Sequence, residues 1–153
     1  MKLNADYVRD ILLYIEKNLD YQEPTNPNYH NELLFGKLLA DNVFDEYNKE
    51  ELTYALELLI KEKLIECAKE PYFVRGSLMS ADIIGLTWKG HELLDNVRDN
   101  TVWNAVKNKA LKYGGLSISA LCNGAKFLGN ALMENPNAIE DFLQGIDNIK
   151  KYF

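Results

Sequence analysis

The sequence predicts a mainly α-helical α+β protein with a small β-hairpin: a winged helix-turn-helix over residues 1–99 and a C-terminal helical extension over residues 100–153. Three observations predict this fold. Apolar residues recur at helical spacing through most of the chain, two short alternating segments follow a strongly apolar helix, and another helix begins directly after the second segment. The predicted order is helix, short helix or strand, helix, strand, turn, strand, helix, which is winged helix-turn-helix order.

The N-terminal segment predicts a helix from Asn4 to about Asn18. Asn4 can accept a hydrogen bond from a free amide of the first turn, and an apolar stripe follows it. Residues 19–31 hold two prolines and several asparagines, so they predict a loop. Residues 33–40 fit either a short helix or a short strand, and the helix is the favoured alternative.

The central segment predicts a helix from Asn48 to about Lys63, with Glu51 placed as in a capping box. Apolar residues cover most of its circumference, so we expect it to pack on two sides. Four residues are expected to face solvent: Glu50, Thr53, Glu57 and Lys61. Glu57 and Lys61 are spaced i, i+4 and are expected to pair with each other.

Two alternating segments, residues 64–69 and 81–87, predict the strands of a hairpin that serves as the wing. Between them, Arg75-Gly76-Ser77 is a turn signal.

The helix after the wing is expected to begin at the N-cap Thr87, with Trp88 filling the core and Gly90 allowing a close approach. His91 is expected to pack at the junction of wing and helix, within hydrogen-bonding reach of Asp95. The alternative role for His91 is a switch or a ligand.

The extension predicts three amphipathic segments separated by two breaks. A helix is expected after Asp99 or Asn100, a break at Gly114-Gly115, a helix from Ser117 to about Glu134, a break at Asn135-Pro136-Asn137, and a last helix over residues 138–152. Their apolar stripes must be buried against the winged-helix body, each other or a second subunit. A homodimer through the C-terminal helices and packing within one chain both remain open.

The charge is unevenly distributed along the chain. Of 17 basic and 23 acidic side chains, residues 1–99 carry 11 and 19, a net of −8, and residues 100–153 carry 6 and 4, a net of +2. An acidic body disfavours broad contact with nucleic acid, whose affinity depends on phosphate neutralisation. A local basic patch is still compatible with these counts.

The chain is expected to be cytoplasmic. The N-terminal residues show no signal-peptide pattern, and the most apolar stretch, residues 116–133, is interrupted by polar residues on one helical stripe, so no membrane span is expected. Cys67 and Cys122 lie far apart in sequence, which favours two reduced thiols over a disulfide.

The stretch Ile84-Gly85-Leu86-Thr87-Trp88-Lys89-Gly90-His91-Glu92-Leu93-Leu94-Asp95, followed by Arg98-Asp99 and Val102-Trp103, resembles one known family. This is an uncharacterised winged-helix family of bacteria and their phages, domain of unknown function 2513. The segments at residues 8–13 and 54–60 match its pattern too, and the resemblance spans roughly residues 3 to 113. The loop over residues 19–47 is longer than the family pattern. The resemblance implies a fold and a prokaryotic or phage setting, and no activity.

Motifs of catalysis and metal binding are absent from the sequence. It contains no G-x-S-x-G, no P-loop and no H-E-x-x-H, and its histidines and cysteines show no zinc spacing. We therefore expect no enzyme activity, no cofactor and no metal.

Two functions remain. A DNA-linked transcriptional regulator is favoured by the fold, because the helix before the wing would enter the major groove. A protein-interaction adaptor that does not bind DNA, of phage–host or antitoxin-like kind, is favoured by the acids on that helix. Five residues are candidate contacts to nucleic acid: Lys61, Arg75, Lys107, Lys109 and Lys112.

Overall fold

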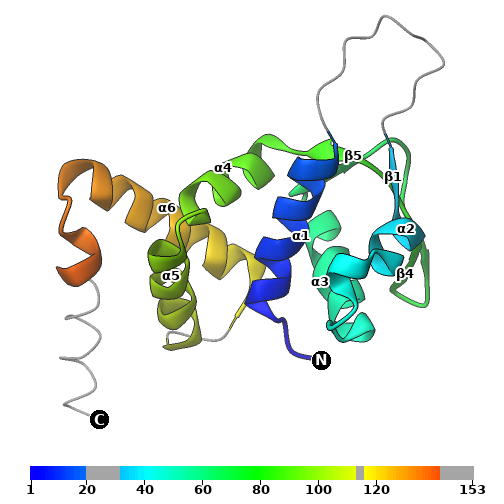
Figure 1. Cartoon of the computed structure of the whole chain (residues 1–153), viewed down its shortest axis with the longest axis horizontal. Helices are drawn as coiled ribbons and strands as arrows, with labels where there is room; N and C mark the ends of the chain where they lie inside the picture. The colour runs from blue at the N-terminus through cyan, green and yellow to red at the C-terminus, as the bar shows by residue number, and fades with distance from the viewer. Residues whose placement is uncertain (20–31, 113–115, 142–153) are drawn as a thin grey trace, which may run out of the picture. The chain divides into compact units, whose positions relative to one another are not determined.

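The structure, a computed structural model, describes residues 1–19, 32–112 and 116–141 (Figure 1). The chain forms two compact units, Met1–His91 and Glu92–Phe153. The predicted α+β class, mainly helical with small antiparallel sheets, is confirmed. The predicted domain boundary after residue 99 stays a prediction.

The first unit opens with α1 (Ala5–Asn18), whose start is fixed by Asn4 as predicted. The Asn4 Oδ1 atom accepts a hydrogen bond from the Asp6 amide at 3.1 Å. The apolar stripe of this helix is fully buried and packs toward α3 and β5. The sequence therefore determines both the start and the inner face of α1.

Residues 33–40 contain both predicted alternatives in succession. Strand β1 (Leu33–Leu34) pairs with β5, and α2 (Phe35–Ala40) follows at once. A short 3-10 helix, η1 (Asn42–Phe44), then connects α2 to α3 (Lys49–Lys61). The Asn48 side chain caps α3 by accepting a hydrogen bond from the Glu51 amide at 3.0 Å, as the sequence predicts.

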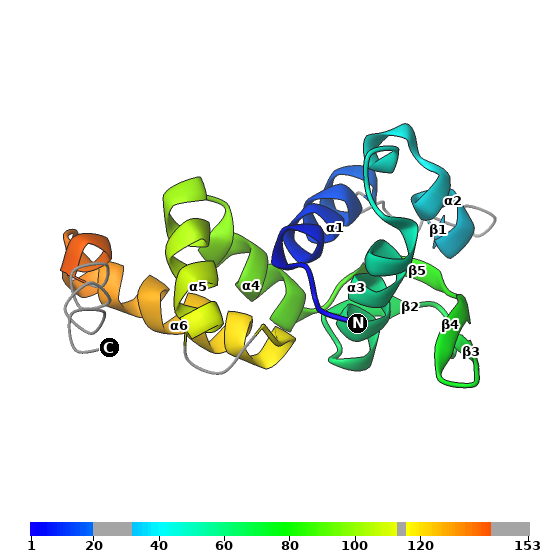
Figure 2. The same ribbon diagram turned by 90° about the horizontal axis from the view of Figure 1, so that it is seen from below.

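Four further strands follow α3. They are β2 (Ile65–Cys67), β3 (Tyr72–Val74), β4 (Ser77–Ser80) and β5 (Asp82–Leu86). Strand β5 lies between β1 and β2 in an antiparallel sheet, whereas β3 and β4 form a separate hairpin, called here the tip hairpin (Figure 2). The two predicted strands do pair, as β2 with β5, but the residues between them form a further hairpin, so the prediction of a turn alone was wrong. The predicted turn at Arg75-Gly76 is real, and both residues have positive φ, 50° and 83°, as a two-residue type I′ turn requires.

Helix α4 (Trp88–Val97) starts at Thr87, whose Oγ1 accepts a hydrogen bond from the Gly90 amide at 3.2 Å. A Cβ on Gly90 would lie 2.2 Å from the Leu64 carbonyl oxygen, so the close approach predicted for this glycine is confirmed.

Two other predictions for α4 were wrong. Trp88 is 85% exposed instead of filling the core, and His91 is exposed instead of packed. The buried side of α4 follows Gly90, Leu94 and Val97, and Trp88 lies about 160° around the helix from Gly90 at 100° per residue. Asp95 bonds to Arg98 at 2.9 Å.

The second unit contains α5 (Asn100–Lys112) and α6 (Ile118–Glu134), which pack on each other. Asp99 caps α5, one of the two predicted caps. Ser117, where a helix was predicted to start, caps α6 by accepting the Ala120 amide at 3.0 Å. The apolar stripe of α6 is buried through Leu128, and the break after Glu134 is also confirmed. Gly114-Gly115 and most of the predicted last helix lie outside the described residues.

No helix within the described part of the chain combines the length and the apolar character needed to cross a membrane.

Candidate interaction surface

The junction between α3 and the tip hairpin is built around Glu57. The sequence predicts that Glu57 faces solvent, but the structure leaves it only 9% exposed. Its Oε2 atom accepts a hydrogen bond from the Leu78 amide at 3.2 Å, and Oε1 lies 2.5 Å from Lys61 Nζ. The tip hairpin covers this side of α3, which no local sequence pattern reveals.

The register of the tip hairpin explains why Glu57 is needed. Val74 and Ser77 flank the two-residue turn, so the next pair, Phe73 and Leu78, does not exchange hydrogen bonds. The Leu78 amide therefore points away from β3 and needs another acceptor. Glu57 supplies it and so also covers the open edge of β4.

Lys61, a candidate contact to nucleic acid, is directed into the same junction. Besides Glu57, its ammonium contacts the Gly76 carbonyl oxygen at 3.3 Å and lies 5.2 Å from the centre of the Phe73 ring. The predicted i, i+4 pair is confirmed. Lys61 thus links α3 to the tip hairpin, because its ammonium pairs with Glu57 on the helix and bonds to the Gly76 carbonyl oxygen on the hairpin.

The first lysine of α3 is engaged in a similar way. Lys49 Nζ donates hydrogen bonds to the carbonyl oxygens of Leu39 and Phe44, both at 2.8 Å. Glu50 beside it is exposed, and Glu51 is half-buried. The helix that would read DNA in a winged helix therefore presents carboxylates, and both of its lysines bond to the protein itself.

Arg75 has a different position from Lys61. It is exposed at the turn of the tip hairpin, next to Gly76. Among the candidate contacts it is the one that lies on the tip hairpin.

The remaining three candidates, Lys107, Lys109 and Lys112, lie on α5 in the second unit and are half-buried. Lys107 Nζ lies 5.5 Å from the centre of the Trp103 ring, and Lys109 Nζ lies 4.3 Å from that of Phe127. Burial lowers the pKa of Lys109. The five candidates are thus divided between the two units, and Lys107 and Lys109 lie over aromatic rings.

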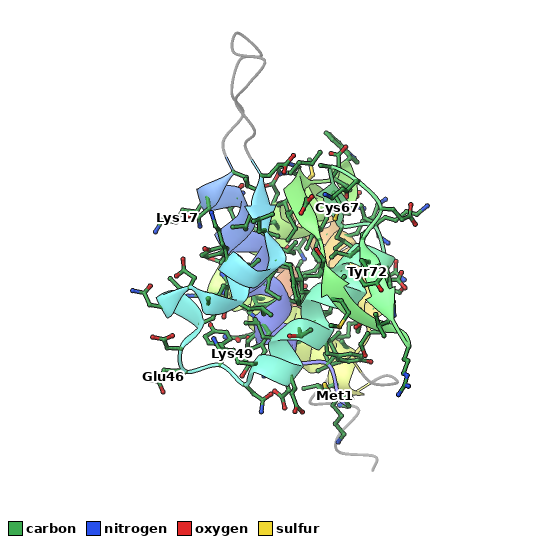
Figure 3. All side chains as sticks on the ribbon, turned by 90° about the vertical axis from the view of Figure 1, so that its right-hand side faces the viewer. Met1, Lys17, Glu46, Lys49, Cys67 and Tyr72 are labelled. Carbon is green, nitrogen blue, oxygen red and sulfur yellow. The ribbon has the colours of Figure 1, made fainter. Side chains whose placement is uncertain are left out.

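The outer face of the tip hairpin is apolar, a feature that the sequence interpretation missed. Tyr72 and Val74 alternate with the inward-facing Phe73 and are 63% and 40% exposed, and Met79 on β4 is 54% exposed (Figure 3). Trp88, in the same unit, is 85% exposed. The alternation from Tyr72 to Val74 was the available signal, but the whole segment was interpreted as a turn.

Comparison with known proteins gives a family without a known activity. Residues 2–117 match the family model DUF2513, whose description is "hypothetical protein". The chain belongs to the DUF2513 family. A relative from Haemophilus influenzae, described as an uncharacterized protein, is 34% identical over 119 residues, which cover 78% of this chain and 86% of the relative. No solved structure matches the chain.

The DUF2513 match places the candidate surface within the family. It covers the whole first unit, including the α3 junction and the tip hairpin, and ends one residue before α6 begins. The resemblance to this family inferred from the sequence is confirmed.

The described residues show no metal-binding site. They contain no group of three or more His, Cys, Asp or Glu side chains arranged to hold a metal ion. Within the described residues neither Cys67 nor Cys122 forms a disulfide, and burial raises the pKa of Cys67. His30 lies outside the described residues.

Proposed function

We propose that the first unit is a winged helix and that it is a non-enzymatic module that binds a protein partner in the cytoplasm of a bacterium or phage-infected cell. The element order from α1 to β5 and the sheet order β1-β5-β2 support the winged helix. In this proposal α3 is the helix before the wing, and the wing consists of β2, β5 and the tip hairpin. A homodimer through residues 100–153 stays a prediction.

The observation that carries the protein-binding function is the engagement of the α3 lysines. A helix that reads DNA presents Arg, Lys, Asn or Gln to the base edges, and its affinity depends on cations near phosphates. On α3, Lys61 bonds to Glu57, and Lys49 bonds to two carbonyl oxygens, whereas Glu50 is exposed. Such a surface repels a phosphate backbone.

The outer face of the tip hairpin supports the same function. Aromatic residues and methionine are enriched in protein interfaces, and exposed apolar residues gathered on one element mark contact sites. Tyr72, Val74 and Met79 are exposed, although the hairpin already packs toward α3 through Phe73 and Leu78. We therefore place the partner on this outer face.

The test is affinity capture from cells of the source bacterium with the wild-type chain and a Tyr72→Ser, Met79→Ser variant. We expect one stoichiometric protein with the wild type and at least a tenfold loss with the variant, because both anchors are removed. The matched control is Met133→Ser in the second unit, where Met133 is 88% exposed. Equal recovery by wild type and double variant would exclude the tip hairpin as the contact.

The second candidate function is DNA-linked transcriptional regulation, and Arg75 is the observation that favours it. A wing tip commonly lies against the DNA backbone, and Arg75 is exposed there. This function predicts an affinity that falls steeply with salt and is weakened by charge reversal at Arg75.

A further inference from the structure

A second part of the first unit holds a pocket that the protein-binding proposal does not use. It lies between α1 and the connection from α2 to α3, and its cavity measures about 460 Å³. That volume lies within the usual range for a small-molecule site, roughly 300–1,000 Å³. Lys17, on the rim of the pocket, is labelled in Figure 3.

Two hydrogen bonds in opposite directions hold the walls of the pocket together. Tyr14 on α1 donates to Asp41 Oδ2 at 2.7 Å, and Tyr47 on the connection donates to Asp10 Oδ2 on α1 at 2.5 Å. The Phe44 ring lies between both tyrosines, with its centre 5.1 Å from each of theirs. These contacts therefore hold the tyrosine and aspartate side chains of the pocket in place.

The charges of the pocket add up to one negative unit. Burial, followed by the bonds to Asp41 and Asp10, raises the pKa of Tyr14 and of Tyr47 to about 12, so both phenols stay neutral donors. The Val43 amide and then the Tyr14 hydroxyl lower the pKa of Asp41. Two carboxylates and the single ammonium of Lys17 therefore line the pocket.

Several hydrogen-bond acceptors of the pocket have no partner among the described residues. The Tyr47 hydroxyl binds Asp10 Oδ2, and Asp10 Oδ1 accepts no hydrogen bond within the described residues. Asn18 uses its amide nitrogen to bond the Tyr14 carbonyl oxygen at 2.8 Å, which leaves its oxygen as an acceptor. Both phenol hydroxyls are already used. A ligand with one positive charge and several donors satisfies these acceptors, whereas the Lys17 ammonium in the same lining opposes it.

We propose that this pocket binds the guanidinium group of an arginine side chain presented by the partner protein. A guanidinium group carries one positive charge, five N–H donors and no acceptor, and it stacks on aromatic rings, two of which line the pocket. A lysine ammonium has three donors and no flat surface. The assignment of the arginine to a protein rests on the proposed function, whereas the preference for guanidinium rests on the pocket alone.

The direct test is an NMR titration of the ¹⁵N-labelled chain with Nα-acetyl-arginine amide. We expect saturable shifts, with a dissociation constant in the millimolar range, at amides of α1 and of residues 41–47. Nα-acetyl-lysine amide should bind at least fivefold more weakly. The absence of saturable shifts, or equal binding of the two probes, would overturn the proposal.

Two variants separate binding from folding. Asp10→Asn should weaken the arginine probe at least fivefold, and Asp45→Asn, an exposed carboxylate on the same connection outside the pocket lining, should leave it unchanged. Lys17→Gln removes the opposing cation and should strengthen binding about two- to fivefold. Partial unfolding cannot produce such a gain, so weaker or unchanged binding by Lys17→Gln contradicts the proposal.

The affinity-capture experiment distinguishes a failure of the pocket proposal from a failure of the proposed function. If the arginine probe binds but no protein is captured, the proposed function fails and the chemistry of the pocket stands. If a partner is captured equally by the wild type and by Asp10→Asn, the pocket assignment fails and the proposed function stands.

Discussion

Two junctions in the first unit tie a helix to its neighbour through polar side chains, and they differ in how completely their atoms are used. At the α3 junction, each carboxylate oxygen of Glu57 has a partner, and Lys61 meets both Glu57 and the Gly76 carbonyl oxygen. At the α1 junction, the two tyrosine–aspartate bonds surround an open pocket and leave Asp10 Oδ1 without a partner among the described residues.

This difference separates a structural role from a binding role. A buried carboxylate with a partner on each oxygen stabilises the fold and presents little surface to a ligand. A carboxylate held by one bond at the wall of a cavity can accept further donors. The same residue types therefore serve the fold at α3 and offer a site at α1.

The largest effect is expected at the saturated junction. Glu57→Ala leaves the Leu78 amide without its acceptor and Lys61 without its counter-charge. We expect the free energy of unfolding to fall by about 1–3 kcal/mol in urea denaturation. Glu57→Gln should recover part of this loss because its amide oxygen still accepts a hydrogen bond.

The matched control is Glu50→Ala, on the same helix but exposed. Its effect should stay within about 0.5 kcal/mol. Equal losses at both positions would show that Glu57 is not the link between α3 and the tip hairpin.

A smaller effect is expected at the open junction. Tyr47→Phe removes the hydrogen bond to Asp10 but keeps the ring next to Tyr7, whose centre lies 4.5 Å away. The free energy of unfolding should fall by about 0.5–1.5 kcal/mol. Tyr72→Phe on the tip hairpin, 63% exposed, is the control, and a comparable loss there would contradict the structural role of the Tyr47 hydroxyl.

The smallest effect is a dependence on alkaline pH that belongs to the open junction alone. The folded chain raises the pKa of Tyr14 and Tyr47 to about 12, mainly by burial, from an ordinary value near 10. Because folding favours the neutral phenols, their contribution is complete below about pH 10 and is lost as the pH rises through about 12. In urea denaturation over this range, a Tyr14→Phe, Tyr47→Phe variant should lose stability less steeply than the wild type, and identical slopes would refute this origin.

The features that the sequence predicted are local ones. Asn4, Asn48 and Thr87 cap the helices that they were expected to cap, because a cap depends on residues within one turn. Gly90 also behaves as expected, since its missing side chain lies against the Leu64 carbonyl oxygen.

The features that the sequence missed depend on residues far apart in the chain. Glu57 is buried by a hairpin 21 residues further along the chain, and the two tyrosine–aspartate bonds join residues 27 and 37 positions apart. Trp88 was predicted to be buried because its side chain is large. Its angular position on α4 instead exposes it to solvent. The candidate basic residues were chosen by charge alone, and the contacts of Lys61 emerge only from the tertiary structure.

The central claim, that α3 presents no free cations to DNA, is tested most directly by fluorescence anisotropy of labelled duplexes from the source genome at about 50 mM salt. Non-specific DNA binders have dissociation constants of roughly 10⁻⁴–10⁻⁶ M at physiological salt and bind more tightly at low salt. We predict no saturable binding up to about 100 μM protein. Saturable binding that weakens steeply with added salt and with Arg75→Glu would contradict the account and favour the DNA-linked function.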